Sequence, residues 1–288
     1  MNKMIQFAQK ALFYNPYLPH PCRIVASTPQ TEDTMLFKVR FEDDKLAEEF
    51  IHKPGQFVQV SVMGTGECPI SIASPPTRHG TVDLCIRKAG RVTEAFHAMG
   101  QNALFGMRGP YGNGYPVDVM EGNNLLIIAG GIGMAPLRSL LLYALDHRSK
   151  FKDIILMYGA RNREDFLFVG ELLSLQGRKD VKTLLAVEHD PDGAWEGEVG
   201  FVTDLFHKLD INANNTYAAV CGPPVMYKFV INNLLDMGFS KGNILMSLER
   251  KMKCGIGKCV HCSVGFKYTC LDGPIFTYWD AINMREII

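Results

Sequence analysis

The sequence contains no apolar run long enough to cross a membrane and no recognisable secretory signal. Residues 1–14 are mildly amphipathic, but their apolar run is broken by Gln6, Gln9 and Lys10. A signal peptide needs a continuous apolar stretch and a small-residue cleavage site. We therefore expect a cytoplasmic protein without membrane insertion, in which residues 1–14 form a short helix that packs on the body or docks on another subunit.

Neither sign of charge is in excess, because 30 Lys and Arg balance 30 Asp and Glu. The chain therefore has no global basic field to attract nucleic acid or an anionic membrane surface. Hydrophobic residues make up 47% and charged residues 21% of the chain, so an ordinary packed core is expected. A length of 288 residues is sufficient for two domains and a small appendage.

The cysteines are not spaced as a disulfide framework. Such a framework spreads its cysteines to staple a small domain, whereas half of the eight cysteines here fall within seventeen residues near the end of the chain. A cluster of this kind in a large chain indicates metal binding. Its members are Cys254, Cys259, Cys262 and Cys270.

The spacing of these four cysteines, C-x4-C-x2-C-x7-C, contains the pattern of plant-type [2Fe–2S] proteins. Gly255 and Gly257 would let the loop wrap so that thiolates and backbone N–H groups point inward. A structural zinc site is the alternative, but such sites favour paired C-x2-C knuckles and one such pair is present. We favour iron–sulfur, and expect His261 to be a surface residue because four cysteines suffice as ligands.

Short alternating segments separated by turns fill the chain from Cys22 to Arg108, which predicts a small antiparallel barrel. One helical stretch, near Thr93–Met99, interrupts it. The expected strands are Arg23–Ala26, Met35–Phe41, Phe57–Met63, Val82–Arg87 and Ala103–Arg108.

After Gly114 apolar runs alternate with helical patterns, which predicts a parallel sheet covered on both faces. The expected strands are Asn124–Ala129, Asp153–Tyr158, Val181–Glu188, Thr216–Cys221 and Ile244–Leu248. The expected helices lie near Pro136–His147, Phe166–Leu175, Val202–Leu209 and Val225–Met237.

Two glycine-bearing loops follow strands of this sheet. Gly130, Gly131 and Gly133 allow a tight turn and a close approach to a pyrophosphate, and Pro136 suits the first turn of the next helix. A tight turn without a ligand remains the alternative. The second loop, Cys221-Gly222-Pro223, ends a strand at the same sheet edge, where ligands of parallel sheets bind. Cys221 could face a bound nicotinamide ring or belong to the core.

Two pieces of the barrel region add to this pattern without deciding it alone. Pro69, Ile70, Ser71 and Ile72 lie on a predicted strand and its exit. The segment Gly90-Arg91-Val92-Thr93 precedes the predicted helix, and Thr93 would be a good N-cap. The same helix start could instead cradle a phosphate.

Taken together, these segments resemble the ferredoxin–NADP reductase superfamily, from about Asn15 to Tyr278. Within it, the chain is similar to FAD- and NAD(P)-binding electron-transfer subunits that end in a [2Fe–2S] domain. The resemblance implies a FAD-binding barrel (residues 21–115), a parallel-sheet NAD(P)-binding domain (116–248) and a small C-terminal [2Fe–2S] segment (249–288), after an N-terminal segment (1–20).

The resemblance also implies roles for individual residues. Pro69-Ile70-Ser71 resembles the flavin motif, although Cys68 stands where the family usually has Arg. Arg87 or Arg91 could supply the charge instead. Gly90 to Thr93 resembles the second flavin motif. Tyr158-Gly159-Ala160-Arg161 is similar to the loop beside the adenosine end of the nicotinamide cofactor, where Arg161 and Arg163 could pair with a 2′-phosphate or stay solvated. NAD and NADP both stay open.

We therefore interpret the chain as a subunit that passes electrons between NAD(P)H, FAD and the cluster, to or from other subunits of a redox complex. No residue is assigned as a catalytic base, and Ser71 and Cys221 are candidates for tuning the cofactors. The segment Arg108-Gly109-Pro110-Tyr111-Gly112-Asn113-Gly114-Tyr115-Pro116 is typical of the sulfhydrogenase and sulfite reductase types, and a hydrogenase-like complex is favoured. The alternatives are the corresponding electron-transfer subunits of anaerobic sulfite reductase and of dihydroorotate dehydrogenase, a stand-alone reductase, and a zinc-containing module that binds nucleotide only as a regulator.

Overall fold

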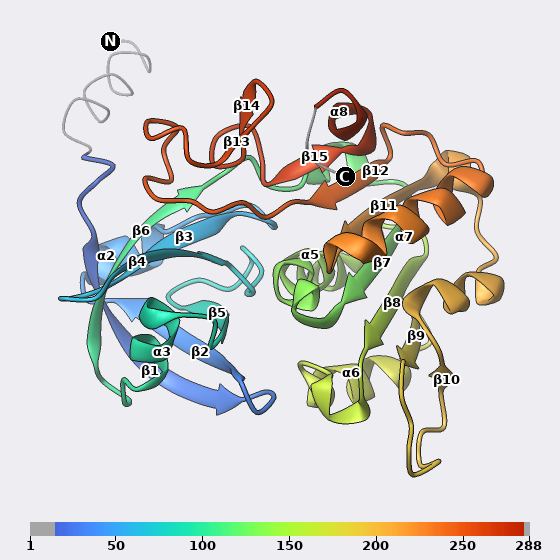
Figure 1. Ribbon diagram of the computed structural model, residues 1–288, viewed down its shortest axis with the longest axis horizontal. Helices are drawn as coiled ribbons and strands as arrows, with labels where there is room; N and C mark the ends of the chain where they lie inside the picture. Colours follow the sequence, from blue (N-terminus) through green and yellow to red (C-terminus); the bar gives the residue numbers. More distant parts are fainter. Residues whose placement is uncertain (1–14, 285–288) are drawn as a thin grey trace.

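The computed structural model of the chain describes residues 15–284, and its first half is a six-stranded antiparallel barrel (Figure 1). The strands follow the spatial order β4-β3-β6-β1-β2-β5. A bridge from Ile72, just after β4, to Leu84 of β5 joins the two edge strands. The strands are β1 (His20–Pro29), β2 (Thr34–Phe41), β3 (Phe57–Val62), β4 (Gly66–Ser71), β5 (Val82–Arg87) and β6 (Leu104–Tyr111); two short helices, α2 (Asp44–Glu49) and α3 (Arg91–His97), accompany them.

Strand β3 is buried on both faces over residues 57–60. In β3, Val58 and Val60 point into the barrel core, as alternation along a strand requires. The intervening positions Phe57 and Gln59 are also buried. They face the C-terminal segment, which crosses back over this side of the barrel (Figure 1).

The second half is a seven-stranded sheet in the order β10-β9-β8-β7-β11-β12-β15, parallel except for β15. Leu125 and Ile127 of β7 pack on the face that carries α5, while Leu126 and Ile128 pack on the face that carries α7. The strands are β7 (Asn124–Gly130), β8 (Ile154–Ala160), β9 (Val181–Val187), β10 (Glu198–Val199), β11 (Thr216–Cys221), β12 (Ile244–Ser247) and β15 (Ile275–Thr277); the helices are α4 (Val117–Met120), α5 (Met134–Asp146), α6 (Val169–Gln176), α7 (Pro224–Asp236) and α8 (Tyr278–Ile282).

The predicted fold class, an antiparallel barrel followed by a parallel sheet and a cysteine-bearing C-terminal segment, is confirmed. Two local details differ. The stretch expected as a helix near Val202–Leu209 is a 3-10 helix over Val202–Lys208. The C-terminal segment, in which no strand is expected after Ile244–Leu248, contains the hairpin β13 (Ser263–Val264) and β14 (Lys267–Tyr268), and returns β15 to the sheet edge beside β12. The helix expected over residues 1–14 lies outside the described residues.

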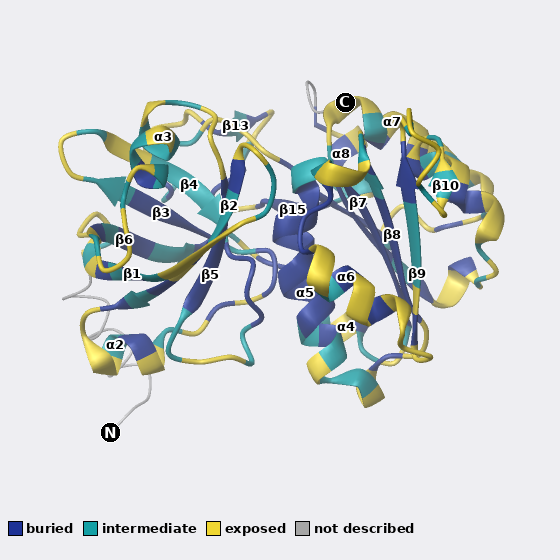
Figure 2. Cartoon of the chain, turned by 90° about the horizontal axis from the view of Figure 1, so that it is seen from below, coloured by how far each residue is buried: buried dark blue, intermediate teal, exposed yellow. Residues whose placement is uncertain are grey.

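A buried arginine joins the barrel to the half of the molecule that contains the seven-stranded sheet. Arg138 of α5 donates to the Ala73 carbonyl at 3.0 Å and to the Asp83 carboxylate at 3.1 Å, both in the barrel. It also donates to Glu171 of α6 at 2.8 and 2.5 Å. The neighbouring Ser139 hydroxyl donates to the Ser74 carbonyl at 2.6 Å. Helix α5 is accordingly buried between the two halves (Figure 2), and their relative placement is held by specific bonds.

Among residues 15–284, every helix is too short or too polar to span a membrane.

Candidate functional site

A cavity of about 250 Å³ lies where the barrel, the sheet and the C-terminal segment meet. Three segments that are far apart in the sequence form its wall: β4 with β5 and the start of α3, the loop after β7, and residues 247–252 with Pro274. Its polar groups are few and its floor is largely apolar, as in most small-molecule sites. The lining residues are Phe57, Cys68, Pro69, Ile70, Ser71, Cys85, Arg87, Ala89, Thr93, Ile132, Ala135, Pro136, Ser247, Leu248, Glu249, Arg250, Met252 and Pro274.

The structure thus brings together most of the barrel residues that the sequence singled out. Ser71, Arg87 and Thr93 share this cavity with Pro136 from the glycine loop. Arg87 is exposed and lines the same cavity as Cys68. Arg91 is exposed and is not part of the wall. Of the two arginines considered as a substitute for the missing cation, Arg87 is the one at the cavity.

The start of α3 differs from the expectation that Thr93 caps it. The N-cap is Gly90, and Thr93 is the third helical residue. The Thr93 hydroxyl accepts from the N–H groups of Ala89 at 2.9 Å and Gly90 at 3.1 Å, and donates to the Gly90 carbonyl. The hydroxyl therefore organises the turn before the helix, and the prediction of Thr93 as N-cap is wrong. Gly90 can be the N-cap because its backbone carbonyl accepts the first helical bond, from Glu94.

The two glycine loops are in contact with each other at the carboxyl edge of the sheet. A Cβ built on Gly133 would lie 2.3 Å from the backbone oxygen of Cys221, and one on Gly130 would lie 2.6 Å from the sulfur of Met226. Gly131 has a φ of +51°, and a Cβ there would meet nothing within 4 Å. Gly130 and Gly133 therefore serve close packing of the loops. Gly131 leaves open space at the strand end, where a pyrophosphate could approach the backbone.

We predict that Gly133→Ala, which forces the loop away from Cys221, disables nucleotide use. A shift of the order of 1 Å at a positioning loop can cost about 100-fold in rate, and we expect a loss of that order in the rate of flavin reduction by NADH, measured by stopped flow. Gly170→Ala is the matched control, because a Cβ on this exposed glycine would meet nothing within 4 Å. Reduction at the normal rate in Gly133→Ala would contradict the assignment.

Cys221 is buried at the end of β11, beside a small polar group of buried atoms. Its thiol lies 3.8 Å from the Ser247 carbonyl, which also accepts from the Tyr227 hydroxyl at 2.5 Å. Burial raises the pKa of the Cys221 thiol to about 12, with a further contribution from Glu249. Cys221 is thus a neutral thiol that packs in the core next to Ser247 of the cavity wall, and its tuning role, like that of Ser71, stays a prediction.

Arg161 lies just beyond the carboxyl end of β8, at the sheet edge that also carries the two glycine loops. Its side chain is exposed. Arg163, two residues on, pairs with Glu164 at 3.1 Å. The position of Arg161 is compatible with a nucleotide at this edge, and its role there stays a prediction.

The four clustered cysteines form two pairs. The side chains of Cys254 and Cys259 contact each other, as do those of Cys262 and Cys270. Within residues 15–284, no three Cys, His, Asp or Glu side chains gather around one point as a single metal ion would need. Two pairs suit two irons with two thiolates each. His261, as expected, is exposed.

Backbone N–H groups surround these sulfurs. Lys258 and Cys259 donate to the Cys254 sulfur at 3.3 and 3.4 Å, and Gly257 donates to the Cys270 sulfur at 3.1 Å. Burial raises the pKa of Cys254, but N–H donors from Ile256, Cys259 and Lys258 outweigh it and lower the pKa to about 7. Because iron binds thiolates, this environment fits a cluster.

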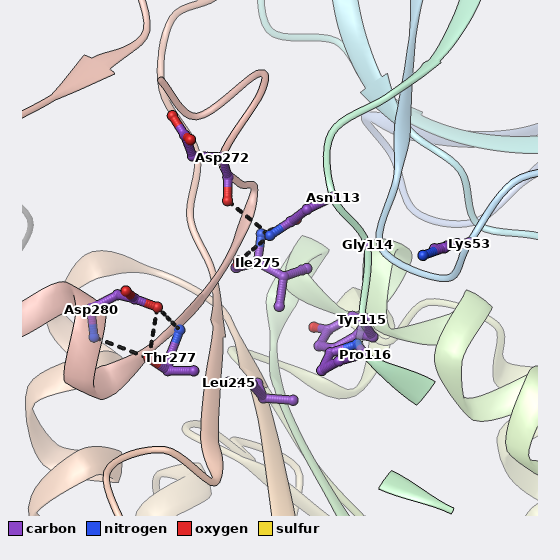
Figure 3. Close-up of a pocket in the computed structure, with 10 residues that line it drawn as sticks. All are labelled: Lys53, Asn113, Gly114, Tyr115, Pro116, Leu245, Asp272, Ile275, Thr277 and Asp280. Atoms are coloured by element: carbon purple, nitrogen blue, oxygen red, sulfur yellow. Dashed lines mark hydrogen bonds between the residues drawn. The ribbon is translucent and has the colours of Figure 1, made fainter. Parts of the chain in front are cut away.

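A second cavity of about 300 Å³ lies between the barrel exit and the C-terminal segment, around Tyr115, Ile275 and Asp280 (Figure 3). Asn113 closes one side, donating to the carbonyls of Asp272 at 2.8 Å and Ile275 at 2.7 Å. None of the residues predicted to bind a cofactor lines this cavity. The hydrogen bonds of Asn113 hold the C-terminal segment against the chain that follows β6.

Sequence reasoning missed one wall of the first cavity, residues 247–252. This stretch follows β12 and runs directly into Cys254. No local pattern predicts that this stretch lines the cavity, because its position depends on the return of β15 to the sheet. Residues 247–252 therefore connect the wall of the cavity directly to the cysteine loop.

The cavity, the two glycine loops and the cysteine pairs define a flavin- and nicotinamide-dependent oxidoreductase that also carries an iron–sulfur site. The sequence matches the oxidoreductase FAD-binding domain over residues 21–115, the oxidoreductase NAD-binding domain over 127–232, and the iron–sulfur cluster binding domain of dihydroorotate dehydrogenase B over 249–281. The chain is 48% identical to the sulfhydrogenase 2 subunit gamma of Pyrococcus furiosus over 95% of its own length and 100% of that protein. It is 47% identical to the sulfhydrogenase 1 subunit gamma of the same organism, over 95% and 96%.

The chain belongs to the family of FAD- and NAD-binding oxidoreductase subunits that end in an iron–sulfur cluster binding domain. A more distant relative is the probable dihydroorotate dehydrogenase B (NAD(+)) electron transfer subunit of Pyrococcus furiosus, at 32% identity over 83% of this chain and 85% of that protein. The predicted cofactors, FAD, a nicotinamide nucleotide and an iron–sulfur cluster, are confirmed, and the [2Fe–2S] form is inferred from the family.

Solved structures show the same fold. A chain of the NADH-dependent reduced ferredoxin–NADP oxidoreductase aligns with a TM-score of 0.71 at 23% identity, over 91% of both chains. A ferredoxin NADP+ reductase from Neisseria gonorrhoeae aligns with a TM-score of 0.65 at 19% identity, over 78% of this chain and 96% of that one.

Proposed function

We propose that this protein is the electron-transfer subunit of a hydrogenase-like complex and passes electrons between NAD(P)H and partner redox subunits. The observation that carries the proposal is that buried side chains connect the flavin cavity to the cluster cysteines without a break. Phe57 lines the cavity with the flavin-motif residues and also belongs to the buried cluster that contains Cys262 and Cys270. When bound, the flavin takes two electrons as hydride from the nicotinamide and can pass them singly to the cluster.

The residues of the chain would bind and orient these groups. Pro69, Ile70 and Ser71 would line the flavin ring, with Ile72 supporting them from the barrel core. Arg87 would supply the cation that Cys68 does not, and Gly90 to Thr93 the turn beside the pyrophosphate. The Gly130–Pro136 and Cys221–Pro223 loops, with Arg161, would hold the nucleotide. The division into residues 1–20, 21–115, 116–248 and 249–288 belongs to the same proposal.

The partner side would be the exposed face of the cysteine loop. Cys259 is the exposed member of the four cysteines, and Val260 beside it is 52% exposed. A single electron would leave or enter here, where the cluster comes nearest to the surface. The similarity to the two sulfhydrogenase gamma subunits favours a hydrogenase partner. The proposal also includes a cytoplasmic location for the complex. Sulfite reductase, dihydroorotate dehydrogenase and stand-alone reductase roles are the alternatives.

The test is to purify the protein anaerobically with its partners and record the visible spectrum before and after adding NADH, then NADPH. We expect flavin bands and a broad iron–sulfur absorbance that one nucleotide bleaches, with hydrogenase subunits co-purifying. A colourless zinc protein would overturn the cluster, and a sirohaem partner would replace the hydrogenase. If the iron is lost in handling, reconstitution with iron and sulfide decides between the outcomes.

A further inference from the structure

One buried side chain of the barrel has polar atoms without a partner. Gln59 is 0% exposed, and neither its Nε2 nor its Oε1 has a hydrogen-bond partner within residues 15–284. Buried polar groups in folded proteins are nearly always hydrogen-bonded, because an unpaired one loses its hydrogen bonds to water and gains none in return. The Nε2 group of Gln59 is therefore available to donate to a group that is not part of the polypeptide.

The amide lies against the loop of the cluster cysteines. A Cβ built on Gly255 would be 3.2 Å from Cγ and 3.3 Å from Nε2 of Gln59. Gly255 directly follows Cys254, and its φ of +74° is one that glycine adopts readily. Phe57, two residues earlier on the same face of β3, lines the flavin cavity, whereas Gln59 does not. The Gln59 amide thus lies beside the loop of the cluster cysteines and outside the flavin cavity.

The residue paired with Gln59 across β6 holds the same loop. Arg108, which is 3% exposed, donates through Nη1 to the carbonyl of Cys254 at 2.6 Å. It also makes a bidentate bond to the Glu67 carboxylate, at 2.9 and 2.8 Å. A planar guanidinium fixed in this way positions the backbone of Cys254 beside Gln59.

We propose that the Gln59 amide is a hydrogen-bond donor to the sulfur atoms at the Cys254 end of the cluster, and that Arg108 is the positioning residue that brings this end to it. The inference rests on the proposed function, since it requires the cluster. Hydrogen bonds to cluster sulfurs set the reduction potential. A donor stabilises the reduced cluster more than the oxidised one because the reduced cluster carries one more negative charge. Gln59 and Arg108 therefore raise the potential of the cluster and ease its reduction by the flavin.

The test uses the full chain with its cofactors and replaces Gln59 by leucine, which removes the donor and suits a buried site. The midpoint potential of the cluster is measured by anaerobic redox titration, with the electron paramagnetic resonance signal of the reduced cluster as readout. We expect Gln59→Leu to make reduction about tenfold less favourable, a negative shift of about 59 mV for one electron, with the flavin midpoint unchanged. Gln59→Met, which keeps the unbranched shape, should shift the potential in the same direction.

Thr183→Val is the matched control, because the Thr183 hydroxyl is also buried without a partner within residues 15–284 but lies on β9. It should leave the cluster potential in place. An unchanged midpoint and unchanged signal in both Gln59 variants would overturn the inference, even if their thermal stability changed. Failure of the proposed function has a different signature, since the unaltered protein would then contain no iron.

Discussion

Cys259→Ala should yield a protein that binds FAD and is reduced by the nicotinamide nucleotide but has lost its iron–sulfur absorbance. Cys259 is in contact with Cys254, so in the proposed cluster its removal would take one of two thiolates from the same iron. Because Cys259 is exposed, its truncation leaves no buried cavity. Loss of the cluster would therefore reflect the missing ligand and not a damaged fold.

Iron content, labile sulfide and the visible spectrum measure the result after anaerobic purification. His261→Ala is the matched control, an exposed residue of the same loop that we expect not to bind metal. It should keep full iron content. We also expect Cys259→Ala to accept electrons from NADH into the flavin at nearly the normal rate while electron delivery to the partner subunits falls below detection. A complete cluster in Cys259→Ala would remove this cysteine from the ligand set.

Strands that carry their own periodicity were predictable from the sequence. The run Thr216–Cys221 was expected as a strand and is observed with those bounds as β11, since a buried parallel strand needs a continuous apolar run. The cysteine spacing likewise predicts an iron–sulfur cluster in this segment, in agreement with the iron–sulfur cluster binding domain matched over residues 249–281. In these cases the signal is local, because neighbouring residues alone decide the structure or the chemistry.

The features that sequence reasoning missed depend on contacts between distant segments. The three residues of β15, Ile275–Thr277, are too few for a pattern and are held by pairing with β12. Gln59 and Arg108 alternate with apolar residues, and such polar positions in a strand normally face water. They are buried here because the C-terminal segment lies over β3 and β6, and Pro16 and Glu67 also contact Arg108. The residues that surround the cluster beyond its own cysteines could not be predicted for this reason.

Removal of the ion pair between the two halves of the molecule should cause the largest loss in the free energy of unfolding. Arg138 is 3% exposed, and it links Asp83 of the barrel to Glu171 of α6. Burial lowers the pKa of Arg138, but its hydrogen bond to Glu171 and the charges of Glu171 and Asp83 outweigh this and raise it. Arg138→Met would leave Asp83 buried with a bond to Lys38 alone as its ionic partner.

Breaking a buried pair in this way costs about 3–5 kcal/mol, and we expect a loss of that order in urea unfolding followed by flavin fluorescence. Because Arg138 also holds the Ala73 carbonyl, two residues after the cavity residue Ser71, flavin reduction by NADH should slow as the two halves lose their fixed placement. Arg178→Met is the matched control, since Arg178 makes an equally bidentate bond to Asp180 on the surface and exposed pairs contribute little. Adding Asp83→Asn to Arg138→Met removes the stranded charge and should restore part of the stability. Equal stability of Arg138→Met and Arg178→Met would show that the two halves are held together by apolar packing instead, with the arginine contributing no more than a surface pair.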